Sequence, residues 1–282
     1  MSKRKIIVAK HAGFCFGVKR AVEIAEKALE SGKKTYCVGH LIHNNQVIDM
    51  LKKNGLIMVK NISDIPSSGV MIIRSHGMPL NEIKKAEKKK IEILDATCPF
   101  VKKAQIVAKD FCQKGYDVVI CGDSKHAEVI GINSHIKNLG IVIKNPGEVK
   151  KIKFRKNKIG ILSQTTEKKS LLREVVGEVM NFGIKHIEIE NTNCIDSQTK
   201  QQEVQVLAKN VNAMIIVGGK FSNNTNKLFE LAKKICKDTH HIETEKELKK
   251  EWFLGVKKIG IAAGASTADF LIDNVVKGIR SL

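Results

Sequence analysis

AGFCFGVKRA (residues 12–21), DATCPFVKKA (95–104) and NTNCIDSQTK (191–200) decide the fold, because they are three copies of one pattern. In each copy one cysteine stands between a strand-like apolar stretch and a helix-like one: Cys15, Cys98 and Cys194. A glycine follows each cysteine 24 residues later: Gly39, Gly122 and Gly218. The cysteines themselves lie 83 and 96 residues apart, so each copy is domain-sized and longer than the units of a solenoid. One thiol per copy could bring three sulfurs to a common point, as a single metal centre requires.

Polar side chains recur at fixed places in the same repeat. Four residues beyond each glycine come His43, His126 and Ser222. Six residues beyond it come Asn45, Glu128 and Asn224. A third apolar stretch in each copy ends in His76, Thr165 and Ser266.

Short apolar runs alternate with helical patterns along the chain, which predicts an α/β fold with mostly parallel sheets. We expect three pseudo-equivalent α/β units at 1–96, 97–191 and 192–269, with 270–282 packing on the first. Ligands of parallel sheets lie beyond the carboxyl ends of the strands, where all the recurring polar residues fall. Pseudo-threefold packing of the units would direct them toward one axis.

Composition limits the classes of partner. The formal net charge is +20, from 49 Lys and Arg against 29 Asp and Glu. A solubilising lysine surface explains such a charge, and so does attraction of an anion. Aromatic residues make up only 5%, and no zinc-finger or aromatic RNA-binding motif occurs, so we expect a small acidic ligand and no nucleic acid.

The apolar runs are too short for a membrane span, and the N-terminal sequence has no apolar core of signal-peptide length. We therefore expect a cytoplasmic protein with no membrane contact. Seven cysteines without a Cys-x-x-Cys pair argue against a disulfide framework in such a chain. We interpret Cys37, Cys112, Cys121 and Cys236 as core residues.

Three cysteines placed before helix starts favour thiolates, which the unpaired helix N–H groups stabilise. Three thiolates without a fourth suit a [4Fe–4S] cluster with one iron left open. Zinc is the alternative, although the local cysteine pairs usual at structural zinc sites are absent.

The polar sets could line a small cavity for phosphate oxygens. Glu128 breaks their symmetry, because the other two copies have an amide in its place. Nearby anions would favour the neutral carboxyl, so we interpret Glu128 as a general acid.

Nine segments together resemble the LytB (IspH) family of 4-hydroxy-3-methylbut-2-enyl diphosphate reductases. They cover nearly the whole chain in the family's order: AGFCFGVKRAV, LIHNNQVI, RSHGMP, DATCPFV, GDSKHAEVIG, SQTT, NTNC, GGKFSNNTNKL and AGAST. The resemblance implies a trefoil of three α/β domains around one [4Fe–4S] cluster held by Cys15, Cys98 and Cys194. It also implies reductive removal of the hydroxyl of an allylic diphosphate as water, giving isopentenyl and dimethylallyl diphosphate in the last step of the non-mevalonate pathway.

The resemblance also assigns roles to single residues. Glu128 matches the proton donor, Thr165 lies near the substrate hydroxyl, and His126 belongs to both the catalytic and the binding group. The diphosphate-binding positions are His43, His76, His126, Ser222, Asn224 and Ser266, joined by Asn223 where a serine is common. Ala268-Asp269 replaces a common proline after AGAST. Ferredoxin or reduced flavodoxin would supply the electrons.

Two other classes stay open on the residues alone. One is a zinc enzyme acting on a phosphorylated metabolite, and the other is a basic nucleic-acid-binding protein without catalysis. Colour distinguishes both from an iron–sulfur protein, which is brown when purified without oxygen, whereas the other two are colourless.

Overall fold

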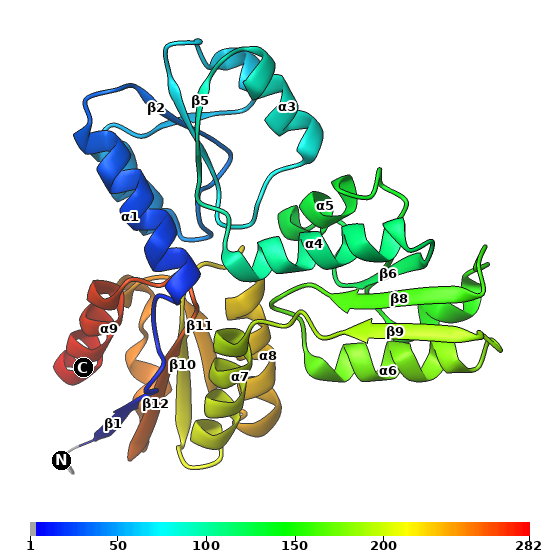
Figure 1. Ribbon diagram of the computed structural model, residues 1–282. Helices are drawn as coiled ribbons and strands as arrows, with labels where there is room; N and C mark the ends of the chain where they lie inside the picture. The colour runs from blue at the N-terminus through cyan, green and yellow to red at the C-terminus, as the bar shows by residue number, and fades with distance from the viewer. Residues whose placement is uncertain (1–3) are drawn as a thin grey trace. The chain divides into compact units, whose positions relative to one another are not determined.

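The computed structural model describes residues 4–282, whose strands form three four-stranded parallel sheets flanked by helices (Figure 1). The first sheet has the order β3 (Ile57–Val59), β2 (Thr35–Val38), β4 (Val70–Ile73), β5 (Glu92–Asp95). The second has the order β7 (Ile141–Ile143), β6 (Asp117–Cys121), β8 (Lys158–Ser163), β9 (His186–Glu190). The third has the order β11 (Thr239–Ile242), β10 (Ala213–Val217), β12 (Lys258–Ala263), β1 (Lys5–Val8). The prediction of an α/β fold with three similar domains is confirmed.

The third sheet takes its last strand from the start of the chain. In the first two sheets that edge strand follows the central one in sequence, whereas β1 pairs with β12 in parallel, with Ile6 opposite Ile259. Each cysteine of the repeat therefore follows the same edge strand of a sheet: Cys15 after β1, Cys98 after β5 and Cys194 after β9.

Helices connect the strands as parallel pairing requires. They are α1 (Phe16–Glu30), α2 (Asn45–Lys53), α3 (Leu80–Lys88), α4 (Pro99–Gln113), α5 (Ala127–Ser134), α6 (Lys169–Met180), α7 (Ile195–Ala208), α8 (Asn223–Ile235) and α9 (Asp269–Ser281). Short 3₁₀ helices lie at Ile62–Asp64, Pro146–Lys151, Glu245–Glu247 and Lys250–Phe253. No helix within residues 4–282 is both long and apolar enough to cross a membrane.

Local sequence explains where a representative helix begins and ends. Pro99 occupies the first position of α4, where its missing N–H costs nothing. Gly115, with φ of +81°, ends the helix in a left-handed conformation that favours glycine. Between them, Ala104, Ala108 and Phe111 form a buried stripe at helical spacing.

The chain divides into two compact units. The terminal unit comprises the chain up to Lys19, Ile42–Met50 and Ile195–Leu282, and therefore contains the third sheet. The central unit comprises Arg20–Leu41 and Leu51–Cys194, with the first and second sheets. Each unit is described separately below.

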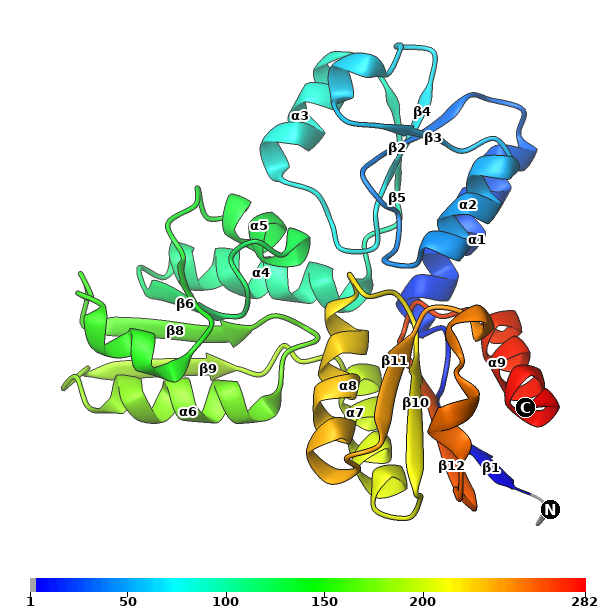
Figure 2. The same ribbon diagram turned by 180° about the vertical axis from the view of Figure 1, so that it is seen from behind.

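In the central unit, helices cover both faces of the second sheet. Figure 2 shows α4 and α5 on one face and α6 on the other. The first face packs Phe111 and Ile132 against Ile120, and the second packs Val175 against Ile161. Strands covered on both faces read as continuous apolar runs, which is why DVVIC and IGIL do not alternate.

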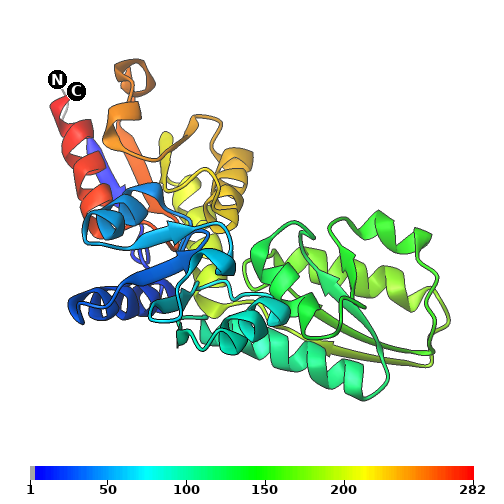
Figure 3. The same cartoon turned by 90° about the horizontal axis from the view of Figure 1, so that it is seen from above.

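In the terminal unit, α7 and α8 pack on one face of the third sheet and α9 on the other. We expected the C-terminal helix on the first unit of the repeat. Instead, Ile272, Val275 and Ile279 join the core formed by β10 and β12, beside Ile6 of β1. Figure 3 shows the N-terminal strand next to α9. The reason is that β1 itself belongs to the third sheet. The boundaries near residues 96 and 191 stay predictions.

Gly160 of β8 tests the close approach of α4 to the second sheet. A Cβ at this position would overlap the Phe111 ring, which is 2% exposed and cannot move into solvent. Overpacking a core costs about 1–3 kcal/mol, so Gly160→Ala should lower the free energy of unfolding by that amount in denaturant titrations. Gly177→Ala in α6 meets open space and should raise stability by up to about 1 kcal/mol. Equal effects of the two variants would contradict this packing.

Candidate functional site

The three cysteines of the repeat occupy equivalent backbone positions. Each amide donates a hydrogen bond to the carbonyl of the second residue after a central strand: Cys98 to Ser75 (2.9 Å), Cys194 to Thr165 (2.8 Å) and Cys15 to Ala265 (3.0 Å). Each cysteine also stands immediately before a helix: Cys15 before α1, Cys98 before α4 and Cys194 before α7. The fold thus presents one thiol at the carboxyl edge of each sheet, where parallel sheets bind ligands.

Burial separates these thiols from most of the others. Cys15, Cys98 and Cys194 are partly exposed, whereas Cys37, Cys121 and Cys236 are buried. Burial raises the pKa of Cys37 to about 12, although Arg74 acts in the opposite direction. Burial likewise raises the pKa of Cys121 to about 12. Metal ligands must be thiolates, so these two buried groups are unsuited to ligation, whereas the three partly exposed thiols before helix starts fit a metal or cluster.

Glu128 is the most deeply buried acid of the central unit, with 1% of its surface exposed. Its carboxylate accepts two hydrogen bonds from Thr165, one from the backbone N–H (2.6 Å) and one from Oγ1 (2.8 Å). Burial raises the pKa of Glu128 to about 7; the two bonds from Thr165 lower it, and the charge of Glu167 raises it. Burial outweighs the hydrogen bonds, so the carboxyl is protonated in a sizeable fraction of molecules near neutral pH.

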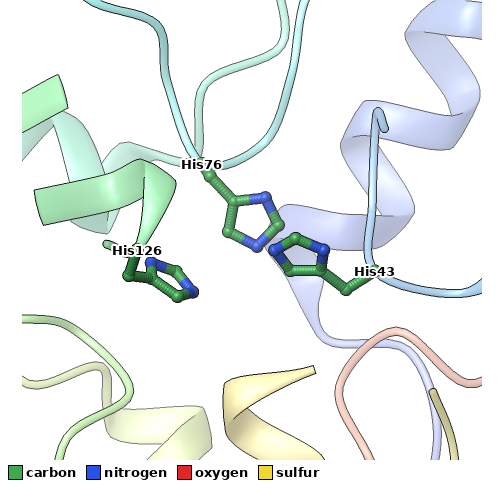
Figure 4. A group of neighbouring side chains, drawn as sticks. All are labelled: His43, His76 and His126. Carbon is green, nitrogen blue, oxygen red and sulfur yellow. The ribbon is translucent and has the colours of Figure 1, made fainter. Parts of the chain in front are cut away.

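His126 and His76 lie near Glu128 in the same unit. His126 caps the start of α5, where its Nδ1 accepts a hydrogen bond from the Glu128 N–H (3.2 Å). The rings of His76 and His126 meet edge to face with centroids 5.6 Å apart (Figure 4). Burial lowers the pKa of His126 to about 4; Asp123 opposes the shift and Arg74 adds to it. The neutral ring accepts through Nδ1, which leaves Nε2–H as a donor. His43, also drawn in Figure 4, belongs to the terminal unit.

The terminal unit gathers the remaining candidates around the end of β12. The Ser266 hydroxyl donates to the His43 carbonyl (3.0 Å). The side-chain Oδ1 of Asn224 accepts a hydrogen bond from the Ala265 N–H (3.0 Å), one residue before Ser266. Ser222 caps α8 by accepting the Thr225 N–H (3.3 Å), and Asn223 is the first residue of that helix. These contacts hold the two loops and the helix start together.

Comparison with known proteins identifies the family. The family model described as LytB protein matches residues 6–280. The chain belongs to the LytB family.

Curated relatives carry one name, 4-hydroxy-3-methylbut-2-enyl diphosphate reductase. The protein from Citrifermentans bemidjiense is 41% identical over 278 residues, covering 99% of this chain and 98% of the relative. That from Aquifex aeolicus is 40% identical over 281 residues, covering 98% and 96%. A solved structure described as (E)-4-hydroxy-3-methyl-but-2-enyl diphosphate reductase, the terminal enzyme of the non-mevalonate pathway, is 40% identical, with a TM-score of 0.74 and coverage of 99% and 100%. The Plasmodium falciparum E-1-hydroxy-2-methyl-but-2-enyl-4-diphosphate reductase is 26% identical, with a TM-score of 0.92 and coverage of 98% and 87%.

The LytB chain departs from strict repetition at two positions that we aligned by spacing. Each central strand ends in a β-turn, at Arg74–Gly77, Gln164–Glu167 and Gly264–Thr267. His76 and Ser266 occupy the third place of their turns, but Thr165 occupies the second, so Thr166 is their equivalent. By helix position Gln46, not Asn45, is level with Glu128 and Asn224, because Asn44 caps α2 by accepting the Val47 N–H (3.0 Å). The position still carries an amide.

The structure adds one residue that the sequence pattern did not single out. The Ser197 hydroxyl, which is 3% exposed, accepts a hydrogen bond from Asn224 Nδ2 (2.9 Å) and so orients one of the candidate binding residues. A signal for it was present in the repeat. Ser197 stands three residues after Cys194, where the other two copies have Val18 and Val101.

The raised pKa of Glu128 predicts a specific dependence of stability on pH. The unfolded carboxyl has its ordinary pKa near 4.5, so its contribution to stability is present below that pH and is lost as pH rises through about 7. The pKa difference of about two and a half units corresponds to a decrease in the free energy of unfolding on the order of 3 kcal/mol. Glu128→Gln should abolish this loss.

Denaturant titrations between pH 4.5 and 8 would measure the effect. Glu174→Gln, on the exposed face of α6, provides the matched control and should follow the unmodified protein. If Glu128→Gln and the unmodified protein keep a constant difference in stability across this range, Glu128 does not take up a proton on folding.

Proposed function

We propose that this LytB chain is an oxidoreductase that converts (E)-4-hydroxy-3-methylbut-2-enyl diphosphate to isopentenyl and dimethylallyl diphosphate. The carbon–oxygen bond of the substrate hydroxyl breaks, two electrons and two protons are taken up, and the oxygen leaves as water. Family membership over nearly the full chain supports this reaction. The single observation that carries it is Glu128, a buried carboxyl hydrogen-bonded to Thr165 whose pKa burial raises to about 7.

Cys15, Cys98 and Cys194 are the proposed ligands of one [4Fe–4S] cluster, since each is a partly exposed thiol in the same backbone setting. Held by these three thiols, such a cluster would pass electrons from the donor protein to the substrate. The protein's own contribution is the rigid attachment of each thiol loop to the end of a sheet.

Glu128 and Thr165 are the proposed proton-delivery pair. The Thr165 hydroxyl lies 2.8 Å from Glu128 Oε2, so the two groups can exchange a proton along one hydrogen bond. A threonine hydroxyl both donates and accepts, which lets Thr165 pass the Glu128 proton to a leaving hydroxyl. A carboxyl with a pKa near 7 is protonated in a useful fraction of molecules at neutral pH and releases the proton readily.

Short polar side chains are proposed to bind the diphosphate: His43, His76, His126, Ser222, Asn223, Asn224 and Ser266. Most of them lie at helix starts or in the turns after β4 and β12, where backbone N–H groups and helix dipoles favour an anion. Neutral His126 would donate through Nε2–H, because its Nδ1 already accepts the Glu128 N–H. The formal net charge of +20 attracts a polyanionic substrate over longer distances.

An acidic electron carrier, ferredoxin or reduced flavodoxin, is the proposed source of electrons, and its negative charge complements this basic chain. We further propose that the enzyme works in the cytoplasm, without a nucleic-acid or membrane partner.

Replacement of single cysteines tests the ligand assignment. Cys15→Ser, Cys98→Ser and Cys194→Ser should each lose most bound iron and sulfide after anaerobic reconstitution, because a serine hydroxyl is a poor ligand for iron in a cluster. The matched controls, with serine at Cys37, Cys112, Cys121 or Cys236, should keep it. Iron and sulfide analysis with the visible spectrum gives the readout. Full iron content in any of the first three variants would refute that residue's role.

Glu128→Gln tests the proton donor. The variant keeps the side-chain volume, and the matching helix positions already hold amides, so the cluster and substrate affinity should survive. A positioned general acid contributes about 10²–10⁴-fold in rate, and kcat should fall by a factor in that range. The assay is substrate-dependent oxidation of a reduced viologen dye without oxygen. Near-normal kcat in a protein with full iron content would show that the proton comes from another group.

A further inference from the structure

The turn after β8 is held by a side chain that the proposed mechanism has not used. Residues Gln164–Glu167 form a β-turn closed by a hydrogen bond from the Glu167 N–H to the Gln164 carbonyl (3.0 Å). Asn193 Nδ2 donates to both ends of this turn, to the Gln164 carbonyl (3.2 Å) and the Glu167 carbonyl (3.0 Å). The Asn193 residue is 8% exposed, so these bonds are shielded from water.

Asn193 also immediately precedes Cys194. The Cys194 N–H donates a hydrogen bond to the Thr165 carbonyl, in the middle of the same turn (2.8 Å). Two adjacent residues therefore bind three carbonyls of the turn that carries Thr165. On its other side, Thr165 donates to Glu128 through both its N–H and its hydroxyl. The thiol loop, the turn and the buried acid thus form one connected hydrogen-bonded group within the central unit.

The other two copies of the repeat lack this connection. Phe14 and Thr97 stand where Asn193 stands, directly before their cysteines. Phenylalanine has no side-chain donor, and the Thr97 hydroxyl bonds with the Asp95 carboxylate. In the first copy the turn ends at Gly77. Its carbonyl accepts a hydrogen bond from Nε of Arg74 (3.2 Å), which belongs to the same turn. Asn193, at the start of the third copy, therefore binds the one turn that carries Thr165, the partner of Glu128 in the second copy.

The Asn193 side chain donates two hydrogen bonds but leaves its own oxygen without a partner. Its Oδ1 is buried without a hydrogen-bond partner, and an unsatisfied buried acceptor lowers stability. An apolar side chain of the same size would avoid that cost. The amide does what an apolar group cannot, which is to fix the direction of two carbonyls on either side of Thr165.

We propose that Asn193 is a positioning residue that joins the Cys194 loop to the Thr165 turn, so that the thiol and the Glu128–Thr165 pair keep a fixed spacing. The role rests on the functions proposed above for these three residues. The physical coupling stands on the hydrogen bonds alone and is tested without the cluster.

Asn193→Leu removes both bonds and keeps the size of the side chain, and Asn193→Asp replaces the donor with an acceptor in case the first variant folds poorly. Asn191→Ala is the matched control, because the exposed Asn191 also bonds this segment, through Oδ1 and the Asn193 N–H (3.2 Å), without touching the turn.

Hydrogen exchange followed by mass spectrometry measures the coupling in cluster-free protein. In both Asn193 variants, exchange at the amides of residues 165, 167 and 194 should rise about 5- to 30-fold, as expected for the loss of two buried hydrogen bonds. The control should match the unmodified protein. Unchanged exchange in the Asn193 variants, or an equal rise in Asn191→Ala, would overturn the coupling.

Turnover of reconstituted protein measures the consequence. With iron content unchanged, kcat of both Asn193 variants should fall on the order of 10- to 100-fold while KM stays within about threefold, because misplacement of a reacting group affects the chemical step. The pH at which kcat declines on the alkaline side should move upward, since weaker bonds from Thr165 let the Glu128 carboxyl hold its proton at higher pH. Faster exchange with normal kcat would overturn the positioning role. Absent turnover in the unmodified, cluster-replete protein would instead refute the proposed function and leave the exchange result standing.

Discussion

The hydrogen bond from each repeat cysteine to the carboxyl end of a sheet is the constraint on which the site depends. A central strand fixes the carbonyls just beyond its end, and the cysteine amide binds the second of them in all three copies. A helix start follows each cysteine directly, and the first N–H groups of a helix have no partner within that helix. The same geometry also requires the N-terminal strand to complete the third sheet, because Cys15 would otherwise have no edge strand before it.

Burial of Glu128 sets a second, opposing constraint. Two hydrogen bonds from Thr165 favour the carboxylate, whereas loss of hydration favours the neutral acid. Burial dominates, and the resulting pKa near 7 lets the group give up a proton at little cost. A weaker burial would leave an anion with no proton to donate, and a site without the Thr165 bonds would hold the proton too firmly.

The sequence predicted the fold class and the equivalence of the three cysteines, because a repeat and continuous apolar strands are local signals. It could not predict that Thr165 lies one turn position away from His76 and Ser266. That difference depends on where each strand stops pairing, and IGILSQT has no residue that marks the end. The placement of the C-terminal helix also escaped prediction, since pairing between the two ends of the chain leaves no pattern in either. Gln46 and Ser197 depended on a helix cap and a side-chain contact that spacing alone cannot give.

Chemistry in this fold arises where the copies differ. Because the backbone pattern occurs three times, the three thiols have similar positions. If the side chains around them were also identical, the three thiols would be chemically equivalent. The second copy has instead an acid where the others have amides and a threonine bonded to it, and Asn193, directly before Cys194 of the third copy, binds the turn that carries this threonine. All three changes lie in one hydrogen-bonded group, so a shift in any one alters the others. The repeat thus gives the three thiols their common backbone setting, and the proposed proton delivery depends on the second sheet, where the Cys194 loop, the Thr165 turn and Glu128 are joined by hydrogen bonds.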